Sequence, residues 1–304
     1  MAYDIITILG PTACGKTKLA ARLCYSIGGE IISADSSQLY KKMNIGTGKD
    51  LTEYTINHKN IPYHLIDIAE PGEKYHVFRY KHDFFAAYEK VKQNHSIPVL
   101  CGGSGMYIEA ILRNYNLVEV PENSELRKEL EKLTLEQLTQ KLSQYKKLHN
   151  KTDVDTKKRA IRAIEIEEYY KHHAIKNNVY PSIKSLTIGL ELDKELRRQK
   201  ISQRLKQRIN EGMIDEVQHL LQQGIKPEDL IYYGLEYKYI TEYLLGYYSF
   251  ETFYTKLETA IFQFAKRQMT YFRGMQRRGI TIHWLNACDD LQENLSKIMK
   301  WYQE

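Results

Sequence analysis

A chain of 304 residues with 42% hydrophobic and 27% charged residues has the composition of an ordinary globular protein, which excludes the disordered, fibrous and membrane-embedded classes. The formal net charge is +6, and the N-terminus has neither a cationic leader nor an apolar run long enough for a signal peptide, so we expect no secretion and no membrane partner. The cysteines lack the spacing of a zinc site, which favours a reducing, cytoplasmic location; they are Cys14, Cys24, Cys101 and Cys288.

Short β-branched runs alternate with helical patterns along the first third of the chain. Such alternation is typical of a parallel sheet with helices on its faces. A helix is predicted from Lys18 onward, where apolar residues recur at helical spacing. Strands are predicted at residues 4–9, 30–34, 63–68 and 97–101.

The middle of the chain has a different pattern. Residues 116–185 contain no convincing strand, and leucines between positions 126 and 142 recur at helical spacing, as does a second pattern at 155–170. A strand follows at 186–192, then a mostly helical C-terminal third with a last strand at 280–285. We therefore predict an α/β core made of residues 1–115 and 186–304, interrupted by an all-helical insertion at 116–185.

A glycine-rich segment follows the first strand and precedes the first helix. It matches the pattern G-x-x-x-x-G-K-[ST], in which backbone N–H groups surround phosphate oxygens at a helix N-terminus. The lysine of this pattern reaches the terminal phosphate, and the hydroxyl after it can ligate Mg²⁺. The pattern predicts a P-loop NTPase-like fold, but it leaves open which phosphorylated ligand is bound. Its residues are Gly10, Pro11, Thr12, Ala13, Cys14, Gly15, Lys16 and Thr17.

Two clusters of cations stand out from the mild overall charge. One lies at Lys157, Lys158, Arg159 and Arg162, and the other spans residues 197–208, which hold six cations and no acid. Either cluster is compatible with an ordinary solvated helix face or with contacts to nucleic-acid phosphates.

Further motifs follow the glycine-rich segment in a fixed order, and together they resemble the tRNA dimethylallyltransferases, also called tRNA isopentenyltransferases. The resemblance covers residues 10 to about 284, nearly the whole chain. The motifs lie at residues 33–40, 44–49, 62–67, 102–107, 159–165, 204–217 and 266–273.

The resemblance implies transfer of a dimethylallyl group from dimethylallyl diphosphate to the exocyclic amine of the adenosine immediately 3′ of the tRNA anticodon. Diphosphate would leave, stabilised by the phosphate-binding segment, by Lys16, by Mg²⁺ on Thr17 and, by resemblance, by Arg204. Asp35 follows the second strand and is the candidate general base for the amine; an ordinary loop or cap role is its alternative.

The resemblance also implies a tRNA interface. Ser104 would hydrogen-bond the target nucleotide, and the segment Asp35, Ser36, Ser37 and Gln38 would read the edge of a base flipped out of its stack. Phosphates of the anticodon stem-loop would contact the two basic clusters. The first of these corresponds to the segment Lys157, Lys158, Arg159, Ala160, Ile161, Arg162 and Ala163.

Three other functions share some of these features. A small-molecule kinase needs the same phosphate-binding segment, an isopentenyltransferase can act on free adenine nucleotides, and a nucleotide-gated RNA-binding protein needs no turnover. The insertion and the basic clusters favour a macromolecular substrate. We expect a monomer, and we expect the pairs Tyr232–Tyr233 and Tyr247–Tyr248 to pack in the core rather than to contact RNA.

Overall fold

The computed structural model describes residues 3–146, 148, 152–173 and 180–304. The chain divides into two compact units: Met1–Tyr115 joins Tyr180–Glu304 in the first, and Asn116–Val179 makes the second. Each unit has a hydrophobic core of its own. Within the described helices, none is long and apolar enough to span a bilayer.

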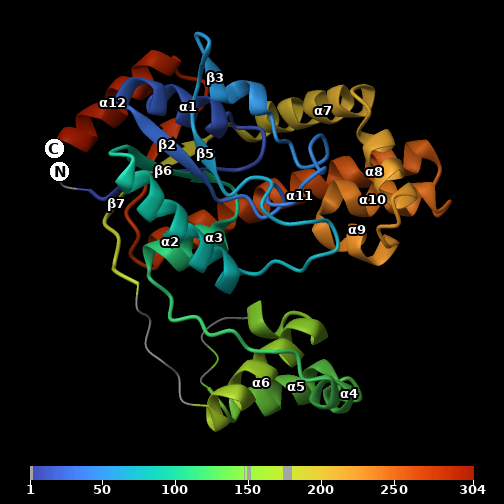
Figure 1. Ribbon diagram of the computed structural model, residues 1–304. Coiled ribbons are helices and arrows are strands. Elements are labelled where there is room, and N and C mark those ends of the chain that lie inside the picture. Colours follow the sequence, from blue (N-terminus) through green and yellow to red (C-terminus); the bar gives the residue numbers. More distant parts are fainter. Residues whose placement is uncertain (1–2, 147, 149–151, 174–179) are drawn as a thin grey trace. The chain divides into compact units, whose positions relative to one another are not determined.

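A six-stranded sheet lies at the centre of the first unit (Figure 1). All neighbouring strands are parallel, and their order in space is β5-β2-β6-β1-β7-β8. The strands are β1 (Ile5–Leu9), β2 (Gly29–Ser33), β5 (Tyr63–His64), β6 (Ile97–Gly102), β7 (Ser185–Glu191) and β8 (His283–Asn286), and a separate hairpin pairs β3 (Thr55–Ile56) with β4 (Lys59–Asn60).

Alternate side chains of the central strand β1 enter two different cores, because successive residues of a strand point to opposite faces of the sheet. From β1, Ile5 and Leu9 join the core beneath α2 (Val77–Gln93) and α3 (Gly105–Leu112). Ile6 and Ile8 join the core beneath α1 (Lys16–Ile27) and α12 (Leu291–Gln303). Figure 1 shows these two pairs of helices on opposite faces of the sheet.

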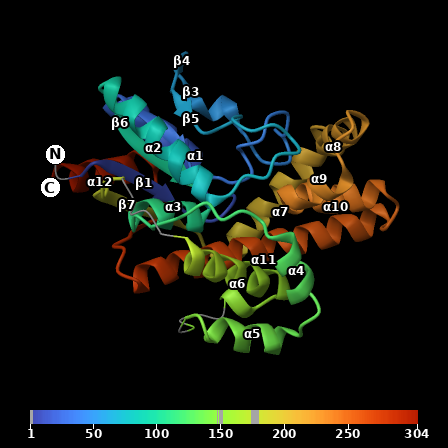
Figure 2. The same ribbon diagram turned by 60° about the horizontal axis from the view of Figure 1, so that its bottom comes forward.

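Five helices lie between β7 and β8, and they extend the first core beyond the sheet. The longest, α11, packs on α7 and α10 and also on α3, so it connects the helical part of the unit with the sheet (Figure 2). The five helices are α7 (Lys194–Asn210), α8 (Met213–Gln222), α9 (Pro227–Tyr233), α10 (Leu235–Leu244) and α11 (Phe250–Arg277).

The structure confirms the predicted parallel α/β sheet and the strands expected near 4–9, 30–34, 97–101, 186–192 and 280–285. The strand predicted at 63–68 is wrong beyond its first two residues. Leu65 and Asp67 have φ angles of 61° and 56°, which lie in the left-handed region and end the extended conformation.

The second unit contains only helices in its described part. They are α4 (Ser124–Leu130), α5 (Leu135–Ser143) and α6 (Lys157–His172), with a short 3₁₀ turn at Thr152–Val154. Arg127 donates two hydrogen bonds to the buried Glu165 carboxylate at 2.9 and 2.8 Å. Burial alone would raise the pKa of Glu165, but the bonds from Arg127 and from the Asn123 amide outweigh it and lower the pKa.

The insertion was predicted to end at residue 185, but residues 180–185 belong with the first unit. The Tyr180 ring stacks on Phe85 of α2, with centroids 4.2 Å apart and planes 4° from parallel, and Ile183 is buried in the first core. A sequence pattern did not show this boundary, because both contacts are made with residues far away in the chain.

Candidate active site

A pocket of about 420 Å³ opens in the first unit beside the carboxyl ends of β2 and β6 and the phosphate-binding segment after β1. In open α/β sheets, ligands bind at this edge. The predicted site residues that line the pocket are Thr12, Lys16, Thr17, Asp35, Ser36, Ser37, Gln38, Ser104 and Arg204. Helices α7, α9, α10 and α11 supply the opposite wall, with Arg208, Tyr232, Glu236, Phe264 and Gln268 among its residues.

The segment Gly10–Thr17 forms a tight loop that leads into α1. Gly15 has φ 84° and Ala13 has φ 62°, so the loop turns through left-handed conformations before the helix begins at Lys16. A Cβ atom on Gly10 would lie 2.7 Å from the Leu190 carbonyl oxygen, which requires glycine there. Lys16 donates from Nζ to the Pro11 carbonyl at 2.7 Å, so its ammonium group already lies over the loop.

Asp35 lies two residues beyond β2. Its Oδ1 accepts hydrogen bonds from the Ser37 amide at 3.1 Å and from the Ser37 hydroxyl at 2.7 Å. Among the described residues, no hydrogen bond is made to Oδ2. The carboxylate is therefore fixed through one oxygen, and the half-buried side chain lines the pocket.

Ser104 lies at the end of β6 and is tied to the Asp35 segment. Its Oγ accepts a hydrogen bond from the Ser36 amide at 2.9 Å and lies 3.1 Å from the Ser36 hydroxyl. A backbone bond of 3.0 Å from the Ser104 amide to the Ala34 carbonyl adds a second link. The two segments predicted to bind the nucleoside are thus held together as one wall of the pocket.

Two arginines of α7 face the phosphate-binding loop. Arg204 lies 3.5 Å from the Thr12 hydroxyl and 3.3 Å from Asp50, and Arg208 lies 3.5 Å from Asp50. Burial lowers the pKa of Arg208, and the charge of Arg204 lowers it further. Among the residues that the structure describes, no acceptor has hydrogen-bonding geometry to the buried Nη2 of Arg208. The two arginines therefore share the Asp50 carboxylate and place two positive charges in the pocket beside the phosphate-binding loop.

Arg208 was predicted to contact RNA phosphates with the rest of residues 197–208, but it is only 9% exposed and lines the pocket. The spacing of Arg208 from Arg204 could have shown this from the sequence. Residues four apart share one face of a helix, so Arg208 had to lie beside Arg204. Arg198 and Lys206 are exposed and remain candidates for RNA contact.

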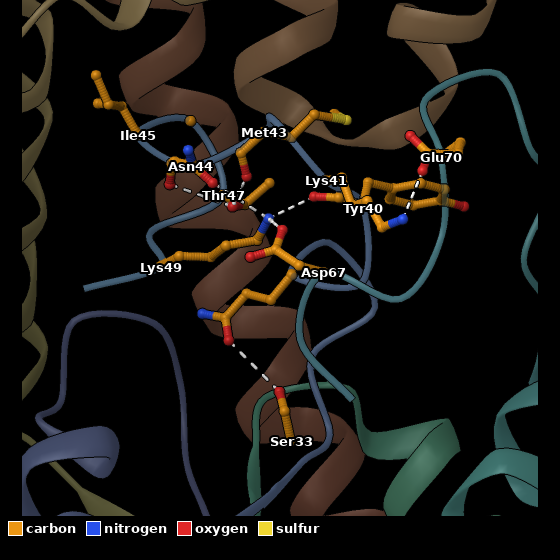
Figure 3. Close-up of polar contacts among 12 residues, drawn as sticks. Ser33, Tyr40, Lys41, Met43, Asn44, Ile45, Thr47, Lys49, Asp67 and Glu70 are labelled. Atoms are coloured by element: carbon orange, nitrogen blue, oxygen red, sulfur yellow. Dashed lines mark hydrogen bonds and ion pairs between the residues drawn. The ribbon is translucent and has the colours of Figure 1, made fainter. Parts of the chain in front are cut away.

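A network around Lys49 holds the loop that forms the rim of the pocket (Figure 3). The buried Lys49 ammonium donates to the Tyr40 carbonyl and pairs with Asp67. Glu216 of α8 accepts hydrogen bonds from three successive amides, those of Asn44, Ile45 and Gly46, at 2.8, 2.8 and 3.1 Å. Sequence reasoning noted these segments only as points of resemblance and gave them no role.

The structure does not expose every residue of the first basic cluster. Ala160, Ile161 and Ala163 are 0%, 7% and 7% exposed and form the core of the second unit with leucines of α4 and α5. Their inclusion in a tRNA-binding segment is corrected accordingly, because their side chains pack inside the protein. The charged residues Lys157, Lys158 and Arg159 remain exposed.

The tyrosine pairs that were expected in the core are only partly buried. Tyr233 is buried, but Tyr232 is 50% exposed and lines the pocket, and Tyr247 is 66% exposed. The prediction is therefore wrong for Tyr232 and Tyr247. Successive residues of a helix point about 100° apart, so within α9 Tyr233 faces the core while Tyr232 faces the pocket.

A parallel sheet with this loop at its carboxyl edge, and with two arginines facing the loop, defines a P-loop protein built to hold a phosphorylated ligand. A family model described as IPP transferase matches residues 38–275, and one described as isopentenyl transferase matches residues 3–61. The chain belongs to the IPP transferase family, as the resemblance predicted.

Individual relatives agree with the family models. A tRNA dimethylallyltransferase of Parabacteroides distasonis is 60% identical over 299 residues, covering 98% of this chain and 97% of the relative. One of Bacteroides fragilis is 58% identical over 302 residues, covering 99% of each chain.

A solved tRNA isopentenylpyrophosphate transferase of Bacillus halodurans is 28% identical, with a TM-score of 0.72, and the match covers 99% of this chain and 96% of that one. A eukaryotic dimethylallyltransferase acting on tRNA is 22% identical, with a TM-score of 0.73 over 94% of this chain and 74% of that one, and shows the shared fold. The predicted P-loop NTPase-like fold is confirmed by these likenesses.

Proposed function

We propose that this protein transfers the dimethylallyl group of dimethylallyl diphosphate to the exocyclic amine of the adenosine immediately 3′ of the anticodon in tRNA. One observation carries the proposal. A single pocket brings the phosphate-binding loop and Arg204 together with Asp35 and Ser104, which come from separate parts of the chain. Prenyl transfer needs a site for a leaving diphosphate beside an acceptor for the proton of the amine, and in this proposal the loop and Asp35 take these two roles.

The phosphate-binding loop serves the leaving group in this proposal. Negative charge grows on the diphosphate as the carbon–oxygen bond breaks. Fixed N–H groups, Lys16 and Arg204 stabilise that charge more in the transition state than in the ground state. The second arginine, Arg208, lies in the same pocket and adds to the positive potential.

The donor atoms at Thr17 fit a magnesium ion. Mg²⁺ prefers oxygen ligands, keeps several waters and usually takes only one or two ligands from the protein besides phosphate oxygens. The Thr17 hydroxyl lines the pocket beside Lys16, and no cluster of three or more His, Cys, Asp or Glu side chains competes for the ion among the described residues. When bound, Mg²⁺ neutralises charge on the diphosphate oxygens. Thr17 would hold it.

The nucleoside wall supplies the acceptor side of the reaction. The adenine must leave its stack to reach a pocket of this kind. As the amine nitrogen forms its bond to the allylic carbon and diphosphate departs, the Asp35 carboxylate accepts one proton from that nitrogen. Ser104 and the segment Asp35–Gln38 would hydrogen-bond the nucleotide and align the amine for attack.

Cations outside the pocket would bind the anticodon stem-loop. On the second unit these are Lys157, Lys158, Arg159 and Arg162, and on α7 they include Arg198 and Lys206. Contacts of this kind position the RNA without reading its sequence. We further propose that the protein works as a monomer, because one chain supplies every residue that the reaction needs.

The proposal is tested with labelled dimethylallyl diphosphate and unmodified tRNA, with no nucleoside triphosphate present. We expect label to enter the tRNA at the adenosine 3′ of the anticodon and an equal amount of diphosphate to appear. Free adenine nucleotides offered in place of tRNA serve as the control, and we expect little transfer to them. Absence of transfer to tRNA, together with movement of phosphate from ATP in a parallel assay that contains ATP, would instead identify a kinase.

A further inference from the structure

Gln268 connects the two halves of the pocket, and nothing in the proposed chemistry uses it. The residue lies on α11 and is 7% exposed. Its Oε1 accepts a hydrogen bond from the Thr12 amide at 2.9 Å, and its Nε2 donates to the Gly103 carbonyl at 3.0 Å. The side-chain amide therefore uses an acceptor and a donor at once, which fixes its orientation.

Each partner of Gln268 belongs to a different half of the site. Thr12 lies within the phosphate-binding loop, and its hydroxyl is near Arg204. Gly103 precedes Ser104, which in turn holds the Ser36 amide. Two hydrogen bonds of Gln268, the peptide bond between Gly103 and Ser104, and the bond from the Ser36 amide to Ser104 thus connect the diphosphate side with the nucleoside side.

The turn at Gly103 leaves room for the glutamine amide. A Cβ atom there would lie 2.5 Å from Nε2 of Gln268, so a larger residue would displace the end of the Gln268 side chain. The bond from Nε2 to the Gly103 carbonyl therefore depends on a residue without a side chain at this position.

The helix that carries Gln268 is itself anchored to the nucleoside side. Tyr271 donates to Oε2 of the buried Glu109 on α3 at 2.7 Å, and Arg278 donates to both Glu109 oxygens at 2.6 and 2.8 Å. Positions 268 and 271 lie on neighbouring turns of one face of α11, and Arg278 directly follows the last residue of this helix. The glutamine therefore extends to the phosphate-binding loop from a helix fixed on α3.

We propose that Gln268 is a positioning residue that sets the register between the diphosphate half and the nucleoside half of the pocket. The inference rests on the proposed function. The allylic carbon is placed by the bound diphosphate and the amine by the nucleoside wall, and the two must meet at attack distance. A displacement of about 1 Å between them costs on the order of a hundredfold in rate, although each half still binds its own ligand.

The test replaces Gln268 by Met, which has similar length and good helix propensity but lacks both hydrogen bonds. Single-turnover transfer, the Kd of inorganic pyrophosphate and the Kd of unmodified tRNA are measured separately. We expect the transfer rate to fall about ten- to a hundredfold while both Kd values change less than about threefold. Gln263→Met is the matched control, because Gln263 lies on the same helix and is exposed, and we expect its rate to be unchanged.

Three results would overturn the inference. A transfer rate within twofold of the parent would show that the register does not depend on Gln268. A tenfold rise in the pyrophosphate Kd would make Gln268 a ligand of the diphosphate rather than a positioning residue. If Gln268→Met does not fold, Gln268→Glu keeps the acceptor for the Thr12 amide, and a parental rate in that variant would overturn the role of the bond to Gly103. Absence of transfer by the parent protein would count against the proposed function, whatever the variants do.

Discussion

Asp35 presents one carboxylate oxygen to Ser37 and leaves the other for the pocket. Asp35→Asn keeps an oxygen that can accept both Ser37 bonds, so the local structure survives, but an amide does not accept the proton. We expect turnover to fall at least ten- to a hundredfold with an unchanged tRNA Kd, measured by single-turnover transfer and by equilibrium binding. Asp215→Asn, at an exposed position of α8, is the control. Unchanged turnover in Asp35→Asn would remove the residue from the mechanism.

Glu216 is a second residue whose contribution can be measured separately, in this case its contribution to the free energy of unfolding. Its carboxylate accepts three backbone N–H groups and the Tyr237 hydroxyl, the last at 2.6 Å. In Glu216→Gln, an NH₂ group replaces one accepting oxygen and faces N–H donors. Hydrogen bonds to a charged group contribute about 1.5–3 kcal/mol, and we expect a loss of that size in the free energy of unfolding by urea. The exposed Glu211→Gln should lose less than about 0.5 kcal/mol; equal losses in the two variants would contradict this role.

The site residues that the sequence predicted and those that it missed differ in how far along the chain their contact partners lie. The phosphate-binding segment was predictable because its partners lie within eight consecutive positions and the glycine spacing is specific to that turn. The location of Asp35 in the pocket was predictable from its place after a strand. Gln268 contacts Thr12 across 256 positions, and Glu216 contacts Asn44 across 172, so no local pattern shows which polar side chain will be buried there.

At the scale of elements, α2 carries a buried cation at the points where the chain leaves and re-enters the first unit. Lys81 is 2% exposed and donates to Oδ1 of Asn114 at 2.6 Å and to the Tyr115 carbonyl at 2.7 Å, while Asn114 donates to the Tyr180 carbonyl at 2.8 Å. Burial lowers the pKa of Lys81 to about 8.

The depressed pKa of Lys81 predicts the sign of a pH effect. Between pH of about 8 and the unfolded pKa of about 10.4, the native state has lost the proton that the unfolded state keeps, so stability rises with pH. We expect the free energy of unfolding of the parent, relative to Lys81→Met, to be constant below about pH 8 and to increase from there to pH 10. Urea unfolding of both proteins across this range measures the difference. A difference that stays flat would mean that the pKa of Lys81 is the same in both states, and one that falls would mean that folding raises this pKa; either would contradict the prediction.

Elements were predicted well where one face of a strand or helix is buried, and less well where backbone conformation decides. Four of the confirmed strands, β1, β2, β6 and β8, place apolar side chains against both cores of the first unit, and β7 places three in one core, so each gives a hydrophobic signal. Residues 63–68 gave the same signal, but the left-handed conformations of Leu65 and Asp67 end the strand there. Those turns serve the loop around Lys49, and no rule of periodicity anticipates them.

At the scale of the whole molecule, the chain interrupts one domain with another and returns to complete it. Residues 116–179 form a unit with its own small core, and the sheet of the first unit is completed by β7 and β8 only after the chain returns. The absence of strand patterns predicted this organisation, because the insertion differs in class from its surroundings. Its end was set six residues too late, since the stacking of Tyr180 on Phe85 leaves no trace in composition.

If exposed cations of the second unit contact RNA phosphates, they contribute to the salt dependence of tRNA binding, which can be measured. Each phosphate contact releases counterions, so log Kd depends on log salt concentration with a slope of about 0.7–0.9 per contact. We expect replacement of Lys157, Lys158 and Arg159 by Gln to weaken tRNA binding and to reduce that slope by about 2, because Arg159 also pairs with Asp155 and Lys157 with the Glu131 carbonyl. Binding is measured by filter retention between 50 and 200 mM salt, roughly the range in which such losses are large.

The matched control for these three residues removes the same charge elsewhere. Lys90, Lys92 and Lys300 are exposed on α2 and α12, and their replacement by Gln lowers the net charge by the same amount. A general field effect of net charge would reduce the slope equally in both triple variants. A contact by the second unit reduces it only when Lys157, Lys158 and Arg159 are changed. A slope that stays at the parental value in that variant would show that this face of α6 does not touch the RNA backbone, and the anticodon stem-loop would then be held by the cations of α7.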